Sequence, residues 1–301
     1  MTVYDTIRPL LPKGLVLADE PMSRHTSFRI GGPAEVYVTP ENTKQMHTVW
    51  QACQQAGIPV TVLGDGCNVL VADSGIKGVV VATALMNQVQ VDAPFITAGS
   101  GTKLARLAET ACKTGLAGLE FASGIPATVG GAVYMNAGAY KSEIKDVCES
   151  VEVLLPDGNI ATYERGLLGF GYRTSRFQNE DEIITAARFK LTPGCPDEIR
   201  ATMNDLNNRR RTTQPLDYPS AGSAFKRPAK EGYYAAKLID DNGLKGFTIG
   251  GAQVSEKHAG FIINKGNAKA SDVLALMKAI QEKVYKSSGI WLEPEVQMLG
   301  F

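Results

Sequence analysis

The segment from Gly124 to Tyr140 constrains the fold more than any other part of this chain. It reads Gly-Ile-Pro-Ala-Thr-Val-Gly-Gly-Ala-Val-Tyr-Met-Asn-Ala-Gly-Ala-Tyr, and so much glycine and alanine cannot build an ordinary side-chain core. Glycine lacks a Cβ atom, so its backbone can take up positive φ and approach a ligand closely. Such a segment can turn its amide N–H groups toward a diphosphate. We therefore expect a ligand to lie against bare backbone here.

A second glycine segment, Leu63 to Leu70, reads Leu-Gly-Asp-Gly-Cys-Asn-Val-Leu and lies between the apolar runs Pro59–Leu63 and Gly78–Ala82. Neither glycine segment has the Gly-Lys-Ser/Thr of a P-loop or the spacing of a dinucleotide-binding turn. Each one alone is more typical of a tight turn. Because Asn68 and Asn136 add neutral hydrogen-bond donors, phosphate binding and tight turns explain the pair equally well.

The size and charge of the chain narrow the class of protein. A chain of 301 residues is too long for one small core, so two or three packed units are expected. Lys plus Arg equals Asp plus Glu at 31 each, which leaves no net field to attract nucleic acid. No apolar run approaches the length that spans a bilayer, and the first residues lack a signal peptide. We expect a cytoplasmic protein that neither binds nucleic acid nor inserts into a membrane; its oligomeric state is left open.

The five cysteines argue against a disulfide framework and against a zinc site, because they are odd in number and form no Cys-x-x-Cys pair. The three histidines are scattered, so no metal site is expected. Cys53 and Cys112 fall on the apolar faces of predicted helices, where buried, inert thiols are expected.

The pattern of apolar residues and turn signals predicts an α+β fold in three domains, 1–83, 84–195 and 196–301. Helices are expected where apolar residues recur at helical spacing, over Thr43–Ala56 (closed by Gly57), from the N-cap Thr102 to Gly115, and over Asp197–Arg211, Tyr233–Asn242 and Ala270–Lys286. Strands are expected at Ala34–Thr39, Pro59–Leu63, Gly78–Ala82, Val151–Leu155, Ile160–Tyr163, Glu182–Lys190, near Phe247, and at Phe261–Asn264 and Ile290–Leu299.

One cluster outside the glycine segments contains Arg173, which lies among aromatic and hydroxyl residues in the stretch 172–177 just before a predicted strand. A charged group needs a partner if it is buried there. An ion pair between domains is the simpler explanation, and a contact with a ligand is the alternative.

Two further clusters carry a hydroxyl and carboxylates. Ser223 lies between small residues near Lys226 and Arg227, whose charges favour loss of a proton and can hold a phosphate or carboxylate. A plain loop hydroxyl is the simpler explanation. Glu293 and Glu295 flank Pro294, which places a carboxylate at the end of a strand. Solvent exposure is the simpler role, and general-acid or polarising chemistry is the alternative.

Taken together, these motifs resemble the UDP-N-acetylenolpyruvoylglucosamine reductases, a family of bacterial cell-wall flavoenzymes. The resemblance runs in order from about residue 20 to the end and rests on Thr26-Ser27-Phe28-Arg29-Ile30-Gly31-Gly32, Gly64-Asp65-Gly66-Cys67-Asn68, Gly124 to Tyr140, Tyr172-Arg173, Ala221-Gly222-Ser223 and Glu295-Val296. No insertion supplies the tyrosine-bearing loop of type I members, so the chain resembles the shorter type II. The resemblance implies two domains that form an FAD-binding unit of the vanillyl-alcohol-oxidase (VAO/PCMH) type and an α/β domain that binds the substrate.

The same resemblance implies the reaction. Members reduce the enolpyruvyl ether of UDP-N-acetylglucosamine enolpyruvate to UDP-N-acetylmuramate in peptidoglycan precursor synthesis, with non-covalent FAD as cofactor and NADPH as reductant. The implied partners are therefore a UDP-sugar and NADPH, and the implied cellular roles are in cell wall biogenesis, cell shape and cell division.

Residue roles follow at the positions that match the family's motifs. Arg173 matches the arginine that helps to polarise the enolpyruvyl carboxylate, Ser223 the hydroxyl that protonates the substrate carbon, and Glu295 the acid that works on the developing enolate. Lys226, Arg227 and His258 are the expected contacts of the UDP-sugar. FAD is expected on the residues Arg29, Gly31, Gly64, Asp65, Gly66, Cys67, Asn68, Gly124, Thr128, Gly130, Gly131, Asn136, Ala137 and Gly138.

The chain departs from the family's pattern at three positions. Ala127 stands where many relatives have glycine, Cys67 where serine is usual, and Lys141 where glycine is common. Two other functions remain open at this point. An FAD-linked oxidase of a small alcohol or hydroxy acid would be reduced by the alcohol and not by NADPH, and a flavin- or nucleotide-sugar-binding module would bind its ligand without consuming NADPH.

Overall fold

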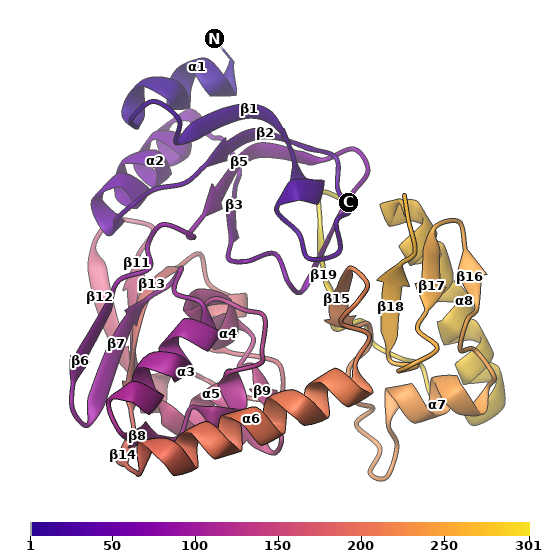
Figure 1. Ribbon diagram of the computed structural model, residues 1–301. Coiled ribbons are helices and arrows are strands. Elements are labelled where there is room, and N and C mark those ends of the chain that lie inside the picture. The colour runs from indigo at the N-terminus through magenta and orange to yellow at the C-terminus, as the bar shows by residue number, and fades with distance from the viewer. Residues whose placement is uncertain (1) are drawn as a thin grey trace. The chain divides into compact units, whose positions relative to one another are not determined.

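The computed structural model describes residues 2–301 and contains two compact units (Figure 1). Each unit gathers segments that are far apart in the sequence. The first unit holds the chain up to Ala18, Glu35–Asp65 and Gly78–Arg210, and the second holds Asp19–Ala34, Gly66–Lys77 and Arg211–Phe301. The domain boundaries expected after residues 83 and 195 stay a prediction.

The N-terminal part of the fold is a small sheet with the strand order β1-β2-β5-β3, in which β3 and β5 are parallel. Helix α2 packs against it, because Met46, Val49 and Trp50 are buried in one cluster with the inward residues of β2 and β5. The prediction of this helix is confirmed, with Gly57 in the left-handed conformation at its end. The elements are α1 Val3–Ile7, η1 Arg8–Leu10, β1 Val16–Pro21, η2 Met22–Arg24, β2 Pro33–Val38, α2 Thr43–Ala56, β3 Val60–Leu63 and β5 Ile76–Ala82.

The rest of the first unit is built on an antiparallel sheet with the order β12-β11-β13-β7-β6. The predicted hairpin is confirmed, with Leu154 opposite Ile160 at its closed end. The sheet consists of β6 Val89–Asp92, β7 Phe95–Gly99, β11 Cys148–Leu154, β12 Ile160–Glu164 and β13 Ile183–Lys190. The remaining elements are α3 Leu104–Lys113, β8 Leu116–Ala117, η3 Glu120–Ala122, α4 Val129–Tyr134, β9 Gly138–Ala139, β10 Ser142–Glu143, α5 Ile144–Val147, η4 Arg165–Leu167, η5 Arg176–Gln178, β14 Thr192–Pro193 and α6 Pro196–Thr213.

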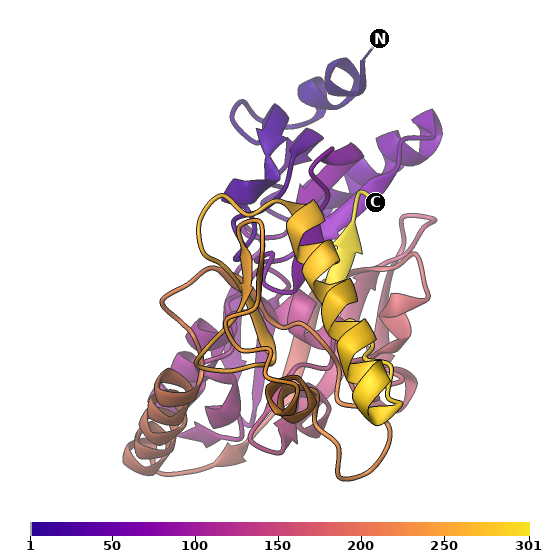
Figure 2. The ribbon, with the colours of Figure 1, turned by 90° about the vertical axis from the view of Figure 1, so that its right-hand side faces the viewer.

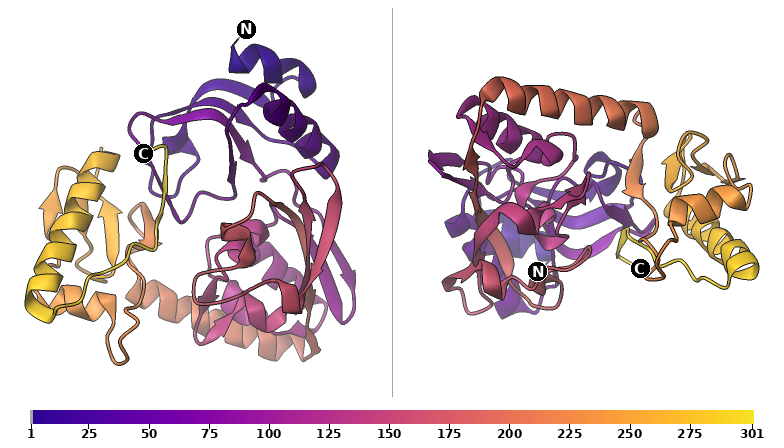
Figure 3. Two further views of the ribbon diagram at one scale, coloured as in Figure 1. Left: turned by 180° about the vertical axis from the view of Figure 1, so that it is seen from behind. Right: turned by 90° about the horizontal axis from the view of Figure 1, so that it is seen from below.

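Two helices of this unit differ from expectation at their ends. Helix α3 begins after Lys103, and the Thr102 hydroxyl, expected to cap it, donates to the carbonyl of Gln88 at 3.3 Å. Helix α6 is longer than predicted at both ends and lies alongside α3 (Figure 3), where the Arg200 guanidinium meets the Glu109 carboxylate at 2.6 Å.

The glycine-rich segment contains an unexpected helix. We expected bare backbone without a core, but α4 forms within the segment, and its Val129, Ala132 and Val133 are fully buried in the apolar cluster of this unit. The small residues permit close packing: a Cβ on Gly130 would lie 3.0 Å from the Cβ of Ser100. The expectation that this segment lacks a core was therefore wrong at α4.

The second unit centres on an antiparallel sheet of order β15-β18-β17-β16. Helix α8 runs along the sheet (Figure 2) and buries Leu276, Met277 and Ile280. Strands β4 and β19 form a separate parallel pair. The elements are β4 Val69–Val71, β15 Ser220–Ser223, α7 Ala235–Asp241, β16 Thr248–Ile249, β17 Ala252–Val254, β18 Phe261–Asn264, α8 Ala270–Ser288 and β19 Gln297–Leu299.

Three expectations for this unit need correction. Ser220–Ser223, taken as a loop, is strand β15. The closing strand is confined to Gln297–Leu299, because Pro294 has no N–H to continue a ladder. Helix α7 is shorter than predicted, and it starts after Tyr234. Between residues 2 and 301, no helix combines the length and apolar character needed to cross a membrane.

Candidate active site

In the first unit, glycines and hydroxyls form a tightly packed cradle. A Cβ on Gly64 would collide with Oγ1 of Thr128, and a Cβ on Gly131 would lie 3.6 Å from the same oxygen. The N–H of Gly130 donates to the carbonyl of Ser100 at 2.8 Å, which fixes the start of α4 beside β7. The structure thus brings together Gly64, Thr128, Gly130 and Gly131, which were predicted from separate parts of the sequence.

Buried hydroxyls in this cradle indicate a polar group that the protein itself does not provide. Thr83 Oγ1, Ser100 Oγ and Thr128 Oγ1 are buried and have no hydrogen-bond partner within residues 2–301. An unsatisfied buried hydroxyl costs free energy, so such atoms call for a partner from bound water or a ligand. The diphosphate and ribityl chain of FAD are rich in hydrogen-bonding oxygens, and the cradle fits them.

Two other predicted cofactor residues of this unit lie against charged neighbours. A Cβ on Gly124 would approach Cδ of Arg210 to 3.2 Å and collide with Oδ1 of Asn207 on α6. Desolvation lowers the pKa of the Arg210 guanidinium. The carboxylate of Asp65 lies 3.5 Å from the Lys103 ammonium group.

In the second unit, the stretch that contains Arg29 and Gly31 packs against the second glycine segment. A Cβ on Gly31 would lie 2.8 Å from the Cβ of Val71, and one on Gly66 would collide with the carbonyl oxygen of His25. Arg29 is exposed and has a φ of 54°. Cys67, next to Gly66, is half-buried. These close approaches explain the glycines at positions 31 and 66, since a larger residue would separate the two segments.

Ser223 lies at a bulge in the sheet of the second unit. Strand β15 pairs with β18 at Ser220 and Ile263 and again at Ser223 and Phe261, so three steps on β15 match two on β18. Gly222, with a φ of 77°, provides the extra residue. Bulges of this kind re-aim the side chain that follows. The bulge therefore sets the direction of the Ser223 hydroxyl.

Glu295 is held beside the same stretch by backbone pairing. Its N–H donates to the carbonyl of Ala224 at 2.9 Å, and the N–H of Lys226 donates to the carbonyl of Glu293 at 2.8 Å. The Asn68 side-chain amide donates to the carbonyl of Glu295 at 3.1 Å. Ser223 and Glu295, predicted from separate motifs, are brought together in the second unit.

The predicted substrate residues belong to this unit as well. Lys226 is half-buried, and the exposed Arg227 lies over the ring of Tyr234, 5.3 Å from its centroid. The Nδ1 atom of His258 accepts the N–H of Gly260 at 3.2 Å. Burial lowers the pKa of His258, which favours the neutral ring with its proton on Nε2.

Arg173 lies in a tight turn of the first unit, in which Gly171 and Thr174 form a bridge. Its φ is 55°, a left-handed value that costs free energy in a residue with a Cβ. The guanidinium donates to the carbonyl of Gly138 at 3.4 Å and lies 5.2 Å from the centre of the Tyr172 ring. Strained backbone of this kind is often found at functional sites.

Asn136 is fully buried, and its side chain bonds to protein groups. Its amide donates to the Glu143 carboxylate at 2.9 Å and to the Gly171 carbonyl at 2.8 Å, and its oxygen accepts the N–H of Lys145 at 3.0 Å. The Asn136 side chain is therefore occupied by protein groups, and the cofactor contacts expected at Asn136, Ala137 and Gly138 stay predictions.

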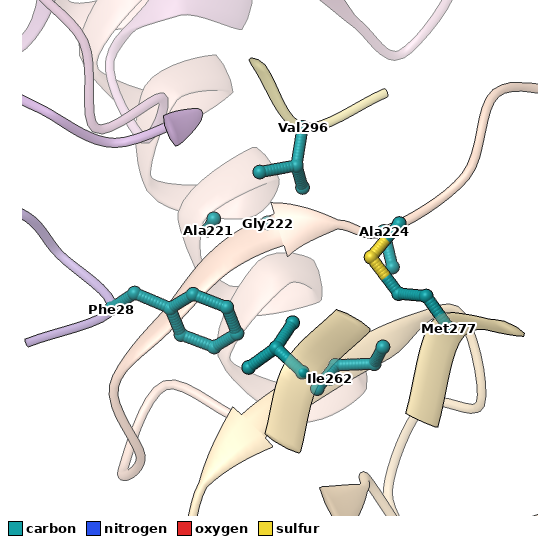
Figure 4. Close-up of a pocket in the computed structure, with 8 residues that line it drawn as sticks. Phe28, Ala221, Gly222, Ala224, Ile262, Met277 and Val296 are labelled. Carbon is teal, nitrogen blue, oxygen red and sulfur yellow. The ribbon is translucent and has the colours of Figure 1, made fainter. Parts of the chain in front are cut away.

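An apolar pocket lies under the Ser223 bulge (Figure 4), where Phe28, Ile262 and Met277 face Val296. Its lining has no polar side chain, so it does not suit a nucleotide sugar. We interpret it as a gap in the apolar core of the second unit.

The cysteines and histidines of the described chain do not form a metal centre: no group of three His, Cys, Asp or Glu residues among positions 2–301 is arranged to hold an ion. Cys53 and Cys112 are buried, as predicted. Burial raises the pKa of Cys53 to about 11, which keeps its thiol protonated and unreactive.

Comparisons with known proteins identify the class first. Residues 34–164 match the model of an FAD binding domain. The fold is also shared with alkyldihydroxyacetonephosphate synthase, at 18% identity and a TM-score of 0.50 over 64% of this chain and 40% of that one. The chain is an FAD-dependent flavoprotein with an α+β fold of the VAO/PCMH type.

The particular family follows from the whole chain. Residues 214–299 match the C-terminal domain of UDP-N-acetylenolpyruvoylglucosamine reductase. The reductases of Agathobacter rectalis and Caldanaerobacter subterraneus are each 48% identical to this chain, with 99% of it and 98% of each relative covered. The solved structure of the reductase from Thermus caldophilus has 36% identity and a TM-score of 0.81, covering 94% of this chain and 98% of that one. The chain belongs to the UDP-N-acetylenolpyruvoylglucosamine reductase family, an FAD- and NADPH-dependent oxidoreductase family.

Proposed function

We propose that Arg173, Ser223 and Glu295 carry the reduction of UDP-N-acetylglucosamine enolpyruvate to UDP-N-acetylmuramate. The observation that supports this proposal most directly is the antiparallel pairing of the Ser223 stretch with the Glu295 stretch in the second unit. The pairing also buries Phe225 and Val296 in the apolar core of the second unit. It supplies a hydroxyl and a carboxylate at one place, as protonation of a substrate carbon requires.

Each of the three residues has a distinct task. FAD, when bound and reduced by NADPH, would supply the hydride for the enolpyruvyl double bond. Arg173 binds the carboxylate of the substrate and stabilises the negative charge that develops on it. Glu295 acts as an acid that donates a hydrogen bond to the same developing charge, and the Ser223 hydroxyl delivers the proton. A serine is a weak acid, and the cations Lys226 and Arg227 favour loss of its proton.

The cofactor and the nucleotide sugar use separate sets of residues in this proposal. The cradle of Gly64, Thr128, Gly130 and Gly131 holds FAD without a covalent bond, together with Gly124 and the backbone of residues 136–138. Arg29, Gly31, Asp65 and the stretch 66–68 complete the FAD contacts. Lys226, Arg227 and His258 bind the UDP-sugar. Burial raises the pKa of the Cys53 thiol to about 11 and the pKa of the Cys148 thiol to about 12. These buried thiols are not available for a covalent flavin link.

The cellular setting follows from this reaction. UDP-N-acetylmuramate is a precursor of peptidoglycan, so we place this chain in cell wall synthesis in the cytoplasm, where its product supports cell shape and division. We also propose that the chain is of type II and takes the UDP-sugar without a tyrosine-bearing loop.

The visible absorption of the purified protein tests the proposal. NADPH should bleach the flavin band under anaerobic conditions, and UDP-N-acetylglucosamine enolpyruvate should restore it stoichiometrically. A small alcohol or hydroxy acid in place of NADPH should leave the band unchanged. Bleaching by the alcohol would favour the oxidase, and a band that NADPH leaves intact would indicate a binding module.

A further inference from the structure

The turn that carries Arg173 is held from one side by the end of helix α4. The Gln178 side-chain amide donates to the carbonyl of Arg173 at 3.0 Å and to the carbonyl of Tyr134 at 3.0 Å. The Ser175 hydroxyl donates to the same Tyr134 carbonyl at 2.7 Å. One glutamine thus ties the arginine's own backbone to the last residue of α4.

Asn136 holds the turn from its other end. Its amide bridges the carbonyl of Gly171 and the carboxylate of Glu143. Glu143 in turn has a lowered pKa: burial opposes this, but the hydrogen bonds of Lys145 and Asn136 and the charges of Lys145 and Arg173 outweigh burial. The ionised Glu143 therefore attracts the Arg173 guanidinium, which lies against the Gly138 carbonyl.

These contacts explain why Arg173 keeps a left-handed backbone. A residue with a Cβ at a φ of 55° is strained, and it persists only where its surroundings over-determine it. Gly171, Arg173 and Ser175 each have a hydrogen bond from or to the 134–138 stretch or Gln178. The turn would otherwise relax and carry the guanidinium away.

We propose that Gln178 and Asn136 are positioning residues for Arg173, acting on the reduction of the substrate through that arginine. The inference rests on the proposed catalytic role of Arg173. It predicts that loss of Gln178 slows only the half-reaction that uses the arginine, which is the reoxidation of reduced flavin by the substrate. Misplacing a catalytic group by about 1 Å costs on the order of a hundredfold in rate.

The test uses Gln178→Met in the FAD-loaded full-length protein, because methionine keeps the length of the side chain and removes its N–H donors. Gln178 is half-exposed, so the variant should fold. We expect reoxidation of the reduced flavin by UDP-N-acetylglucosamine enolpyruvate to slow by about tenfold to a hundredfold. Flavin reduction by NADPH and the melting temperatures with and without FAD should not change. Gln178→Ala serves as a second variant if the first does not fold.

Two controls separate positioning from general damage. Gln45→Ala removes another glutamine whose side chain bonds both a backbone N–H and a carboxylate, on helix α2, and it should change neither half-reaction. In an Arg173→Ala background, Gln178→Met should cause no further loss, because the group that it positions is gone.

The outcomes distinguish this inference from the proposed function. If Arg173→Ala turns over at the normal rate, the proposed function is wrong and the inference is overturned with it. If Arg173→Ala is slow and Gln178→Met is not, the inference alone is overturned. The inference would also be overturned if Gln178→Met slowed both half-reactions equally. The same holds if Gln178→Met slowed substrate reduction by the same factor in the Arg173→Ala protein as in the parent.

Discussion

The backbone N–H of Glu295 donates to the carbonyl oxygen of Ala224 at 2.9 Å. The backbone of Glu295 therefore lies beside Ala224, the residue that follows Ser223. Gly222 adds a bulge directly before the serine, so its hydroxyl direction depends on backbone geometry as well as on its rotamer. This pair is the part of the candidate active site that the structure defines most closely.

Replacing Ser223 by alanine should slow substrate turnover at least about a hundredfold, because loss of one donor in a transition state typically costs about 2.7–4 kcal/mol. NADPH should still bleach the flavin at the normal rate, since the serine acts only on the substrate. Stopped-flow absorption of each half-reaction measures both effects. Ser220→Ala, on the same strand, is the matched control and should change the rate of neither half-reaction. Normal turnover of Ser223→Ala would remove the serine from the mechanism.

Replacing Gly64 by alanine should weaken FAD binding by at least about tenfold, or about 1.4 kcal/mol. The added methyl group would occupy the position of the Thr128 hydroxyl, which would have to move into the cofactor cradle. Titration of the apoprotein with FAD, followed by quenching of flavin fluorescence, gives the dissociation constant. Gly166→Ala is the control, since its Cβ would meet no atom within 4 Å. Unchanged affinity of Gly64→Ala would argue against this cradle as the FAD site.

Replacing Asp73 by alanine should destabilise the second unit by about 1–2 kcal/mol. The carboxylate accepts the N–H groups of Ala270 and Ser271 at 2.8 and 3.1 Å, and so caps the start of helix α8. Urea unfolding at neutral pH, with Ser74→Ala as control, measures the loss. A variant as stable as the parent would show that water replaces the cap.

The same cap should make stability depend on pH. Desolvation raises the pKa of Asp73, but the hydrogen bonds of Ala270 and Ser271 outweigh it and lower the pKa below 3.8. A lowered carboxyl pKa stabilises the fold above the unfolded value, and this stabilisation is lost as the pH falls through the folded value. The difference between parent and Asp73→Ala should therefore be constant above about pH 5 and shrink below pH 4. A difference independent of pH would exclude the ionised cap.

Replacing Lys141 by glycine should stabilise the protein by about 1 kcal/mol. Tyr140 and Lys141 have φ values of 55° and 70° in the two-residue turn between β9 and β10, and both are strained there. Glycine, which has no Cβ, would relieve this strain. Thermal or urea unfolding should show the gain, and Lys141→Val should show a loss, because a β-branched residue fits positive φ poorly. The reverse order of the two variants would refute the explanation.

Some elements were predictable because their signals are local. Helix α2 has Met46, Val49, Trp50 and Cys53 at helical spacing and a glycine at its end, and the structure has the predicted bounds. Helix α4 was missed, because glycine and alanine show no apolar periodicity. Its stability comes from burial of Val129, Ala132 and Val133 against the sheet, which is a tertiary effect.

Several contributors to the site could not have been found from sequence. Ser100 and Gln178 stand in no motif. The Ser100 hydroxyl is buried without a hydrogen-bond partner within residues 2–301, and the Gln178 amide joins the nearby Arg173 carbonyl to the distant Tyr134 carbonyl. The sequence does show Gly-Tyr-Arg-Thr at 171–174, but no local rule reveals that Arg173 has positive φ. A turn signal at Gly171 was the nearest available clue.

The sequence by itself determined the chemistry that this chain can carry: glycine segments that let a cofactor approach, and an arginine, a serine and a glutamate in recognisable motifs. The tertiary structure alone decided that Ala224 pairs with Glu295, that a bulge aims Ser223, and that Asn136 and the contact of Gln178 with Tyr134 hold the Arg173 turn. The physical reason is the separation along the chain between the residues that interact. Local spacing encodes helices and turns, whereas these contacts join residues far apart in the chain and form only when burial of the apolar clusters brings them together.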